Sequence, residues 1–201
     1  HEILKATHMK HHAHTNDADS DPDFFHGNAE NWWQAAVNVN VSYNDDGPAM
    51  KVIQQHMEKD PKFKESMEKG GIWSLFFYFA QIVLAILYPL ETLFLWWIPK
   101  RVATSYLGIV FSYFPHSGLG KGRYKDTRFW TNRIPRYLNH SMQIHTMHHM
   151  YPRICHYDEA KAIEALKPFM IERGMPGAEH IPERIRWNPV TYIREVYFGG
   201  R

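Results

Sequence analysis

Hydrophobic residues are concentrated in the central part of the chain. Residues 72–98 form an almost unbroken apolar run with one formal charge, Glu91, and one proline, Pro89. We interpret Glu91 as marking a local break beside Pro89. A helix that crosses a bilayer needs about 20 apolar residues, and this run is apolar on all faces, which favours contact with lipid. Because residues 102–114 are apolar again, the pattern predicts a transmembrane helical hairpin over residues 72–114. A buried hairpin in a soluble protein is the alternative.

The predicted hairpin turns between the two apolar runs. Trp96 and Trp97 precede the sequence Pro99, Lys100, Arg101. Aromatic and basic residues mark membrane interfaces and proline interrupts helices. We therefore expect the turn at Pro99, with the two cations as head-group anchors. Two crossings return the chain to its starting side, which we take to be the cytoplasmic side of the membrane.

The region before the hairpin is polar and carries shorter helical patterns. Residues 1–15 predict the end of a helix that breaks at the turn formers of residues 15–23. We interpret these as a solvated acidic loop, because Pro22 stands where a calcium loop needs glycine. A second helical stretch, 49–69, is interrupted near Asp60. Between them, the pair Trp32-Trp33 suits either a membrane interface or a small core.

The region after the hairpin is also polar. Asp158 is expected to cap an amphipathic helix, and residues 158–201 are expected to form a cytosolic helical tail. One face of that helix carries Ile163, Leu166 and Met170. The sequence thus predicts an all-α fold of one domain, residues 1–201, in which a membrane-embedded helical hairpin carries a histidine-rich helical cap domain.

Charge and cysteine content exclude several classes of protein. The formal net charge of +2 is too small to indicate binding to nucleic acid. The single cysteine, Cys155, excludes an internal disulfide framework and multi-cysteine zinc or iron–sulfur sites. The chain begins with His1 rather than methionine, so we expect it to be processed or truncated.

Two histidine triplets with identical spacing carry the chemistry. Each has the pattern His-x-x-His-His, and they lie on opposite sides of the predicted hairpin, at 8–12 and 145–149. On a helix, offsets of three and four residues bring side chains to one face. Each triplet can therefore aim three imidazoles at one point, and neutral imidazole suits iron, copper, nickel and zinc. We predict that His8, His11, His12, His145, His148 and His149 bind metal at a shared centre.

Two further residues could reach that metal. Asn139 and His140 precede the second triplet by one to two helical turns. His1 lies on the face of His8, but we expect no ligand there. The remaining histidines are predicted to be surface or loop residues: His14, His26, His56, His156 and His180.

These residues resemble the membrane fatty-acid desaturase superfamily, which includes carotenoid ring hydroxylases. The resemblance covers about residues 7–174. Its first half consists of the triplet at 8–12, the sequence Thr15-Asn16-Asp17, the sequence Asp21-Pro22-Asp23 and the two-helix membrane crossing. Its second half consists of Phe114-Pro115-His116, Arg123-Tyr124-x-Asp126-Thr127-Arg128, and the triplet at 145–149 with Gln143, Tyr151, Pro152 and Ile154. The Pro-His and Arg-Tyr segments are nearer to the beta-carotene hydroxylase branch.

The resemblance implies a non-haem di-iron enzyme. Two iron ions, O₂ and two electrons from a ferredoxin- or cytochrome-type donor would hydroxylate or desaturate a membrane lipid, either a carotenoid ring or a fatty acyl chain. The family often places a further histidine or asparagine at the position of His116, which is therefore a candidate ligand. By position in the motifs, Asp126, Asp158 and Asp17 are candidates to orient the imidazoles. The family's earlier box, HxxxH or HxxxxH, is absent from these residues. The resemblance thus implies that the N-terminal part is missing, and it leaves open whether this fragment is active by itself.

Other functions remain as alternatives at this point. A histidine-rich membrane protein could handle metal without redox catalysis, and a bis-histidine haem carrier would leave four of the six triplet histidines unexplained. Zinc is the second candidate metal, although structural zinc usually includes cysteine ligands.

Overall fold

A computed structural model describes residues 2–129 and 142–181. The described residues are helical, with no strand among them, which confirms the predicted all-α fold. The chain divides into two compact units, His1–Ile109 and Val110–Arg201, and each is described by itself.

Among the described residues, the first unit contains a long apolar helix, the four helices that precede it and the three that follow it. Asn31 caps α3 by accepting a hydrogen bond from the Gln34 N–H at 2.9 Å. Asp60 caps α5, because its Oδ1 accepts from the N–H groups of Lys62 and Phe63. The elements are α1 (Glu2–His14), α2 (Phe24–Gly27), α3 (Trp32–Val41), α4 (Pro48–Lys59), α5 (Pro61–Leu87), α6 (Pro89–Thr92), the π-helix η1 (Leu93–Trp97) and α7 (Ile98–Leu107). The predicted interruption of the 49–69 stretch near Asp60 is thereby confirmed.

Helix α5 is the one described helix that is long and apolar enough to cross a membrane. It starts at Pro61, eleven residues before the predicted start, because the Asp60 cap and a proline in the first turn define its beginning. Almost all large apolar side chains of residues 72–107 are exposed. An apolar surface of this extent marks a contact site for lipid or for another protein.

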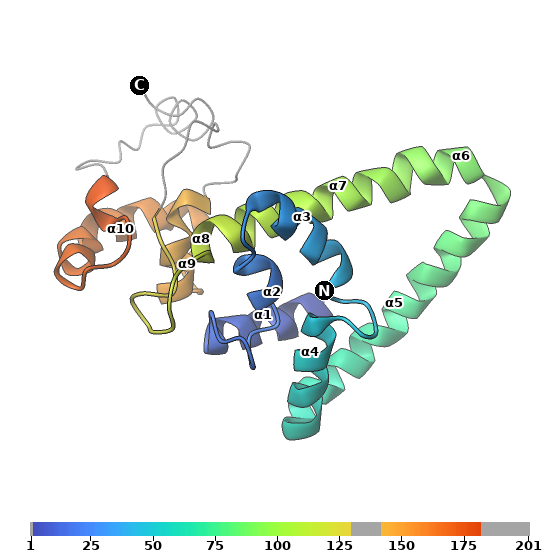
Figure 1. The fold of residues 1–201 in the computed structure, drawn as a ribbon, viewed down its shortest axis with the longest axis horizontal. Helices are drawn as coiled ribbons and strands as arrows, with labels where there is room; N and C mark the ends of the chain where they lie inside the picture. The colour runs from blue at the N-terminus through green and yellow to red at the C-terminus, as the bar shows by residue number, and fades with distance from the viewer. Residues whose placement is uncertain (1, 130–141, 182–201) are drawn as a thin grey trace. The chain divides into compact units, whose positions relative to one another are not determined.

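The predicted turn at Pro99 is wrong. The chain turns at Tyr88, which leaves the helical region with φ −138° and ψ 66°, and Pro89 begins the next helix. Helix α5 and the limb formed by α6, η1 and α7 meet at α6 and separate toward their other ends (Figure 1). Pro99 lies in the first turn of α7 directly after η1, where the wider π turn accommodates a residue without an N–H. The interpretation of a local break at Pro89 is confirmed.

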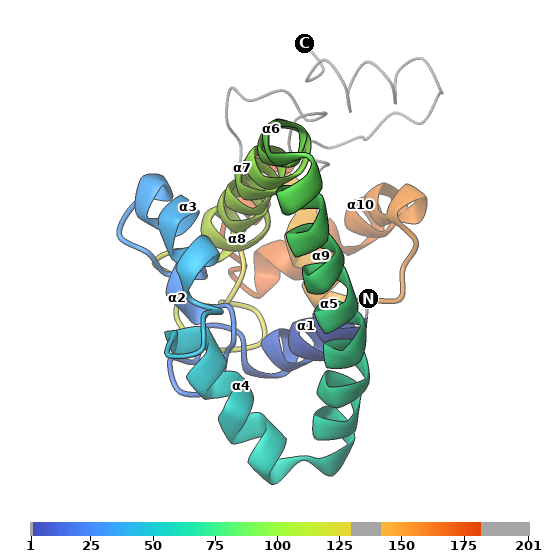
Figure 2. The same ribbon diagram turned by 90° about the vertical axis from the view of Figure 1, so that its right-hand side faces the viewer.

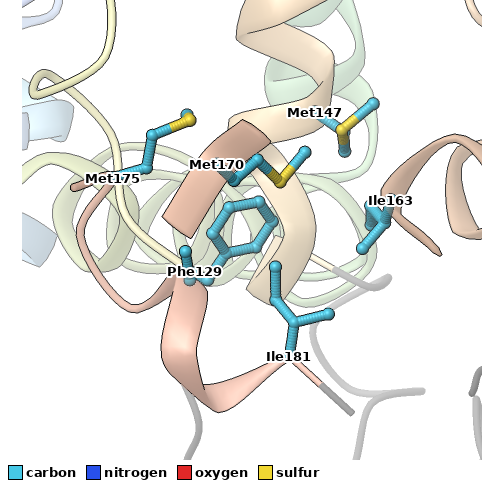
Figure 3. Close-up of a cluster of buried hydrophobic side chains, with 7 residues drawn as sticks. Phe129, Met147, Ile163, Met170, Met175 and Ile181 are labelled. Carbon is cyan, nitrogen blue, oxygen red and sulfur yellow. The ribbon is translucent and has the colours of Figure 1, made fainter. Parts of the chain in front are cut away.

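The second unit is organised around a core rich in methionine. Phe129, Met147, Ile163, Met170, Met175, Ala178 and Ile181 form one buried cluster (Figure 3). Its elements are α8 (Phe114–His116), the 3₁₀ turn η4 (Met142–Ile144), α9 (His145–Met150), α10 (His156–Glu172) and η5 (Ala178–His180). The π-helix η2 (Gly108–Tyr113) leads from the first unit into the second.

The amphipathic helix of the second unit is confirmed, but its cap is not. Ile163 and Met170 of α10 are fully buried, as the spacing predicts. The helix starts at His156, two residues before the expected cap, so Asp158 lies in the first turn. There its carboxylate accepts a hydrogen bond from Lys161 at 3.1 Å and complements the helix dipole.

Candidate metal centre

The first triplet lies on α1 and its imidazoles converge. The Nε2 atoms of His8 and His12 are 3.1 Å apart. Their rings are nearly perpendicular, at 89°, with centroids 4.5 Å apart. His11 stacks on His8 at 5.8 Å with an interplanar angle of 23°. The spacing of three and four residues thus brings the three rings to one face of α1, as predicted.

The second triplet, on α9, repeats this arrangement. The Nε2 atoms of His145 and His149 are 3.1 Å apart, and their rings meet at 72° with centroids 4.7 Å apart. His148 stacks on His145 at 5.3 Å and 27°. Two segments more than 130 positions apart therefore present imidazoles in the same local geometry.

This geometry fits metal ligation. Two nitrogen ligands at right angles on one metal, each with a bond of about 2.1 Å, lie about 3 Å apart. The pairs His8–His12 and His145–His149 both have this separation. A third imidazole in each triplet stacks on the first member of the pair, so each triplet offers three neutral nitrogen donors of the kind that iron and zinc accept.

Asp21 orients one imidazole of the first triplet. Its Oδ1 lies 2.8 Å from His11 Nδ1, and its Oδ2 accepts from the Asn16 N–H at 2.9 Å. Only 2% of Asp21 is exposed. A carboxylate on Nδ1 places the proton there, which fixes the tautomer and leaves the Nε2 lone pair for a metal. Sequence reasoning missed this residue.

The expectation of a solvated acidic loop at residues 15–23 is therefore wrong for Asp21, whose carboxylate is buried. Helix α1 ends at His14, and Asn16 adopts φ 61°, a left-handed conformation that turns the chain back. The Thr15 hydroxyl meanwhile donates to the His11 carbonyl at 2.9 Å. The turn brings Asp21 back against α1, where it contacts His11. The sequence Asp21-Pro22-Asp23, already part of the resemblance, was the signal that could have identified it.

His116 lies beside the second triplet. Its ring centroid is 4.7 Å from that of His149 and 5.6 Å from that of His145. His116 Nδ1 lies 2.9 Å from the backbone oxygen of Asp126, which leaves Nε2 as the lone-pair nitrogen. Asp126 thus orients His116 through its backbone carbonyl. The second unit gathers four imidazoles, and their role as ligands stays a prediction.

The other predicted candidates are placed as follows. Asp158 pairs with Lys161 at an exposed position of α10, and the Asp17 carboxylate accepts from the Asp19 N–H at 3.1 Å in an exposed turn. His1, Asn139 and His140 lie outside the described residues, and the side chain of His156 is not described.

The prediction that His26 is a surface residue is wrong. Its side chain is 97% covered and lies 3.7 Å from the Asp23 carboxylate. Burial lowers the pKa of His26 below its usual value. The Tyr43 hydroxyl donates to the same carboxylate at 2.6 Å. Burial and the charge of Asp23 together raise the pKa of Tyr43 well above its usual value. Burial alone would raise the pKa of Asp23, but His26, His11 and the Tyr43 hydrogen bond outweigh it and lower that pKa.

Histidines elsewhere in the first unit make local contacts. His56 Nε2 lies 2.7 Å from the Ser20 carbonyl oxygen, and its ring is 5.2 Å from that of His14. Burial, followed by the neighbouring His56, lowers the pKa of His14. In the second unit, His180 is exposed, as predicted. His56 therefore supports the loop after α1, since its ring contacts the backbone of that loop.

The comparison with protein families agrees with the geometry. The profile of the family described as fatty acid desaturase matches residues 1–178. No significant match was found among curated proteins or solved structures. The match places the chain in the histidine-box superfamily of di-iron desaturases and hydroxylases, which are membrane-associated, oxygen-dependent oxidoreductases; the nearer affinity to beta-carotene hydroxylases stays a prediction. The chain belongs to the fatty acid desaturase family.

Proposed function

We propose that this protein is an integral membrane oxidoreductase that uses O₂ and two electrons to hydroxylate or desaturate a long apolar lipid. The observation that carries the proposal is the repeated geometry of the two histidine triplets, in a chain of the fatty acid desaturase family. Removing hydrogen from an unactivated C–H bond is beyond side-chain acids and bases, so it needs a redox cofactor.

We propose that the two triplets, with His116, hold two iron ions at one centre. Bound there, reduced iron would pass electrons to O₂ and so supply the oxidant that attacks the C–H bond. The residues of the chain would fix the donors in advance. Asp21 holds the proton on His11 Nδ1, and the Asp126 carbonyl holds the one on His116 Nδ1. Both imidazoles then present Nε2 without rearrangement, which favours binding because the ligand geometry is preorganised.

The membrane would supply the substrate. Helix α5 and the limb from α6 to α7 expose apolar side chains along their length. The space between them holds a cavity of about 650 Å³, lined by apolar residues such as Ile82, Ala85 and Leu93 and also by Lys100 and Arg101. The apolar part of this lining suits a lipid chain, and the two cations suit its polar head group. The polar helices that carry the histidines would then lie at the membrane surface, on the cytoplasmic side.

The reaction also needs an electron donor. We propose a small ferredoxin- or cytochrome-type protein with an acidic surface. The second unit carries 14 Lys and Arg against eight Asp and Glu, whereas the first carries nine against 13. Lys121, Arg123 and Lys125 are exposed on one loop of the second unit. A cationic surface of this kind raises the association rate of an acidic partner and makes it salt-dependent.

A direct test offers two substrates to the purified protein in lipid, with O₂ and a reduced donor. Beta-carotene and phospholipid acyl chains are supplied together, and the products are separated by mass. A hydroxylated carotenoid supports the hydroxylase branch, and new double bonds support the desaturase branch. Full activity in protein loaded with zinc and free of iron would contradict an oxidase, because zinc has no redox chemistry.

A second test addresses the shared centre and does not need turnover. Protein loaded with ⁵⁷Fe should bind two irons per chain. Mössbauer spectra in an applied field should show a coupled, diamagnetic ferric pair. Two uncoupled paramagnetic irons would mean that each triplet binds its own ion. Binding of zinc in place of iron would favour the metal-handling alternative.

A further inference from the structure

Helix α3 exposes an apolar face that no described element covers. Trp33, Val37 and Val41 follow one another at intervals of four residues, so they line one side of the helix. Trp33 is 64% exposed and Val37 is 47% exposed, and Trp32 lies exposed beside them. Single exposed apolar residues are ordinary, but a continuous stripe that includes two tryptophans marks a contact surface.

The opposite face of α3 is fixed to α7. The Ser105 hydroxyl donates to the Ala36 carbonyl at 3.1 Å, and Asn40 Nδ2 donates to Ser105 Oγ at 2.8 Å. Val39 packs on Gly108, where a Cβ would lie 2.6 Å from Val39 Cγ1, so only glycine allows this approach. Both views place α3 beside α7 (Figures 1 and 2). The exposed stripe therefore faces away from the limb on which α3 packs.

The polar groups of α3 are satisfied within the protein. No charged residue occurs between Glu30 and Asp45. The amide and hydroxyl side chains of α3 and its caps have protein partners: Asn31, Gln34, Asn38, Asn40 and Ser42. A helix surrounded by lipid has this requirement, since hydrocarbon offers no hydrogen bonds, whereas a helix in water does not.

The end of α3 also accommodates a cation of the limb. Arg101 Nη1 lies 3.3 Å from both the backbone and the side-chain oxygen of Asn40. Those oxygens lie at the C-terminus of α3, where the helix dipole is negative. The guanidinium also lies over the Trp97 ring at 5.4 Å. Arg101 is thus solvated by protein groups where it borders an apolar surface.

We infer that α3 is a membrane-embedded helix that lies in the interfacial layer of the bilayer. Its tryptophans would lie at head-group depth, and Val37 and Val41 would contact acyl chains. Ten residues span about 15 Å, half the hydrocarbon thickness, so α3 does not cross the membrane. Tryptophan is enriched at this depth because its ring is amphipathic. The inference rests on the proposed insertion of α5 and α7 in the membrane, and it adds a third contact that hydropathy does not reveal.

Spin labels on single cysteines in the reconstituted protein test this depth. Cys155 is the only cysteine, so Cys155→Ser provides the background. Val37→Cys is compared with Leu95→Cys, an exposed position of η1 that serves as the lipid control, and with Gln54→Cys, an exposed position of α4 that serves as the water control. Collision rates with O₂, which concentrates in lipid, and with a nickel chelate, which stays in water, are measured by power saturation.

The Val37 label should resemble the Leu95 label, with O₂ favoured over the nickel chelate, and Val41→Cys should give the same result. A Val37 label that behaves like the Gln54 label, while the Leu95 label is in lipid, overturns the inference alone. A Leu95 label exposed to nickel overturns the membrane insertion itself. A Val37 label shielded from both reagents means that a protein partner or a second copy covers α3, which also overturns the inference.

Discussion

The two histidine triplets have the same internal geometry but are held by different forces. In the first unit, the carboxylate of Asp21 holds His11 from a turn of polar residues. In the second unit, α9 is held by packing, because Thr146 and Met147 between the histidines are fully buried. One metal-binding pattern is therefore supported by a charged hydrogen bond on one side and by an apolar core on the other. The two triplets should respond differently to the same kind of mutation.

The largest effect is expected from removing a ligand. His8→Ala and His148→Ala should each abolish turnover, because each deletes one donor of the proposed shared centre. Each should also destroy the coupled iron signal, even though the other triplet is intact. His180→Ala, an exposed histidine of the second unit, is the control and should change neither measurement. A complete iron pair in either ligand variant would contradict the proposal that both triplets bind the shared centre.

The next largest effect is expected from removing side-chain volume between the histidines of each triplet. Met147→Ala should lower the free energy of unfolding by about 3 kcal/mol, since it leaves a cavity in the methionine-rich core. Met9→Ala is the matched change in the first triplet, where Met9 is exposed, and should cost less than about 0.5 kcal/mol. Thermal unfolding in detergent measures both. Equal shifts would mean that α9 does not depend on the core.

A smaller effect is expected from removing the carboxylate charge that supports the first triplet. Asp21→Asn should weaken metal binding by about 10- to 100-fold, because the neutral amide no longer holds the His11 tautomer. Asp19→Asn, an exposed carboxylate of the same loop, should leave metal affinity unchanged. Competition with a coloured chelator gives the affinities. If Asp21→Asn binds metal as tightly as the parent protein, the carboxylate only shapes the turn.

The smallest effect concerns the ion pair between α1 and the start of α5. The hydrogen bond from Lys10 at 2.9 Å and the N–H of Phe63 hold the pKa of Asp60 below 3.8. A carboxyl group whose pKa falls on folding stabilises the protein above its unfolded pKa, and this contribution is lost as the pH falls through the folded value. Asp60→Asn keeps the helix cap and should reduce stability slightly at pH 7 and by less at pH 3. A constant difference at both pH values would exclude the ion pair as its cause.

The helices and the triplets could be predicted from the sequence because they depend on local spacing. Offsets of three and four residues place His8 and His12 on one face wherever a helix forms. Hydropathy identified the apolar stretch of residues 72–98 because local composition, like local spacing, does not depend on how the chain folds back. The interruption near Asp60 was equally local, since an acceptor followed by proline both caps and starts a helix.

What the sequence did not reveal depends on how the chain folds back. Asp21 looks like its exposed neighbours until the left-handed turn at Asn16 brings it beneath α1. The turn of the hairpin was misplaced because Pro89 and Pro99 both fit a break. The π-helix before the second proline allowed the limb to continue through it. His26 was misjudged for a similar reason, since its burial depends on Asp23 and Tyr43.

The π-helix Leu93–Trp97 also sets the rotational phase of the limb that follows it. A π turn holds about one more residue than an α turn. In a regular α-helix, one extra residue would advance every later side chain by about 100°, whereas the wider turn of η1 absorbs it. The row of Arg101, Ser105 and Gly108 therefore keeps the orientation that receives α3, while Val102 stays exposed. An insertion or deletion of one residue in the regular helix α7 has no such turn to absorb it, and it would rotate the side chains that follow it away from α3.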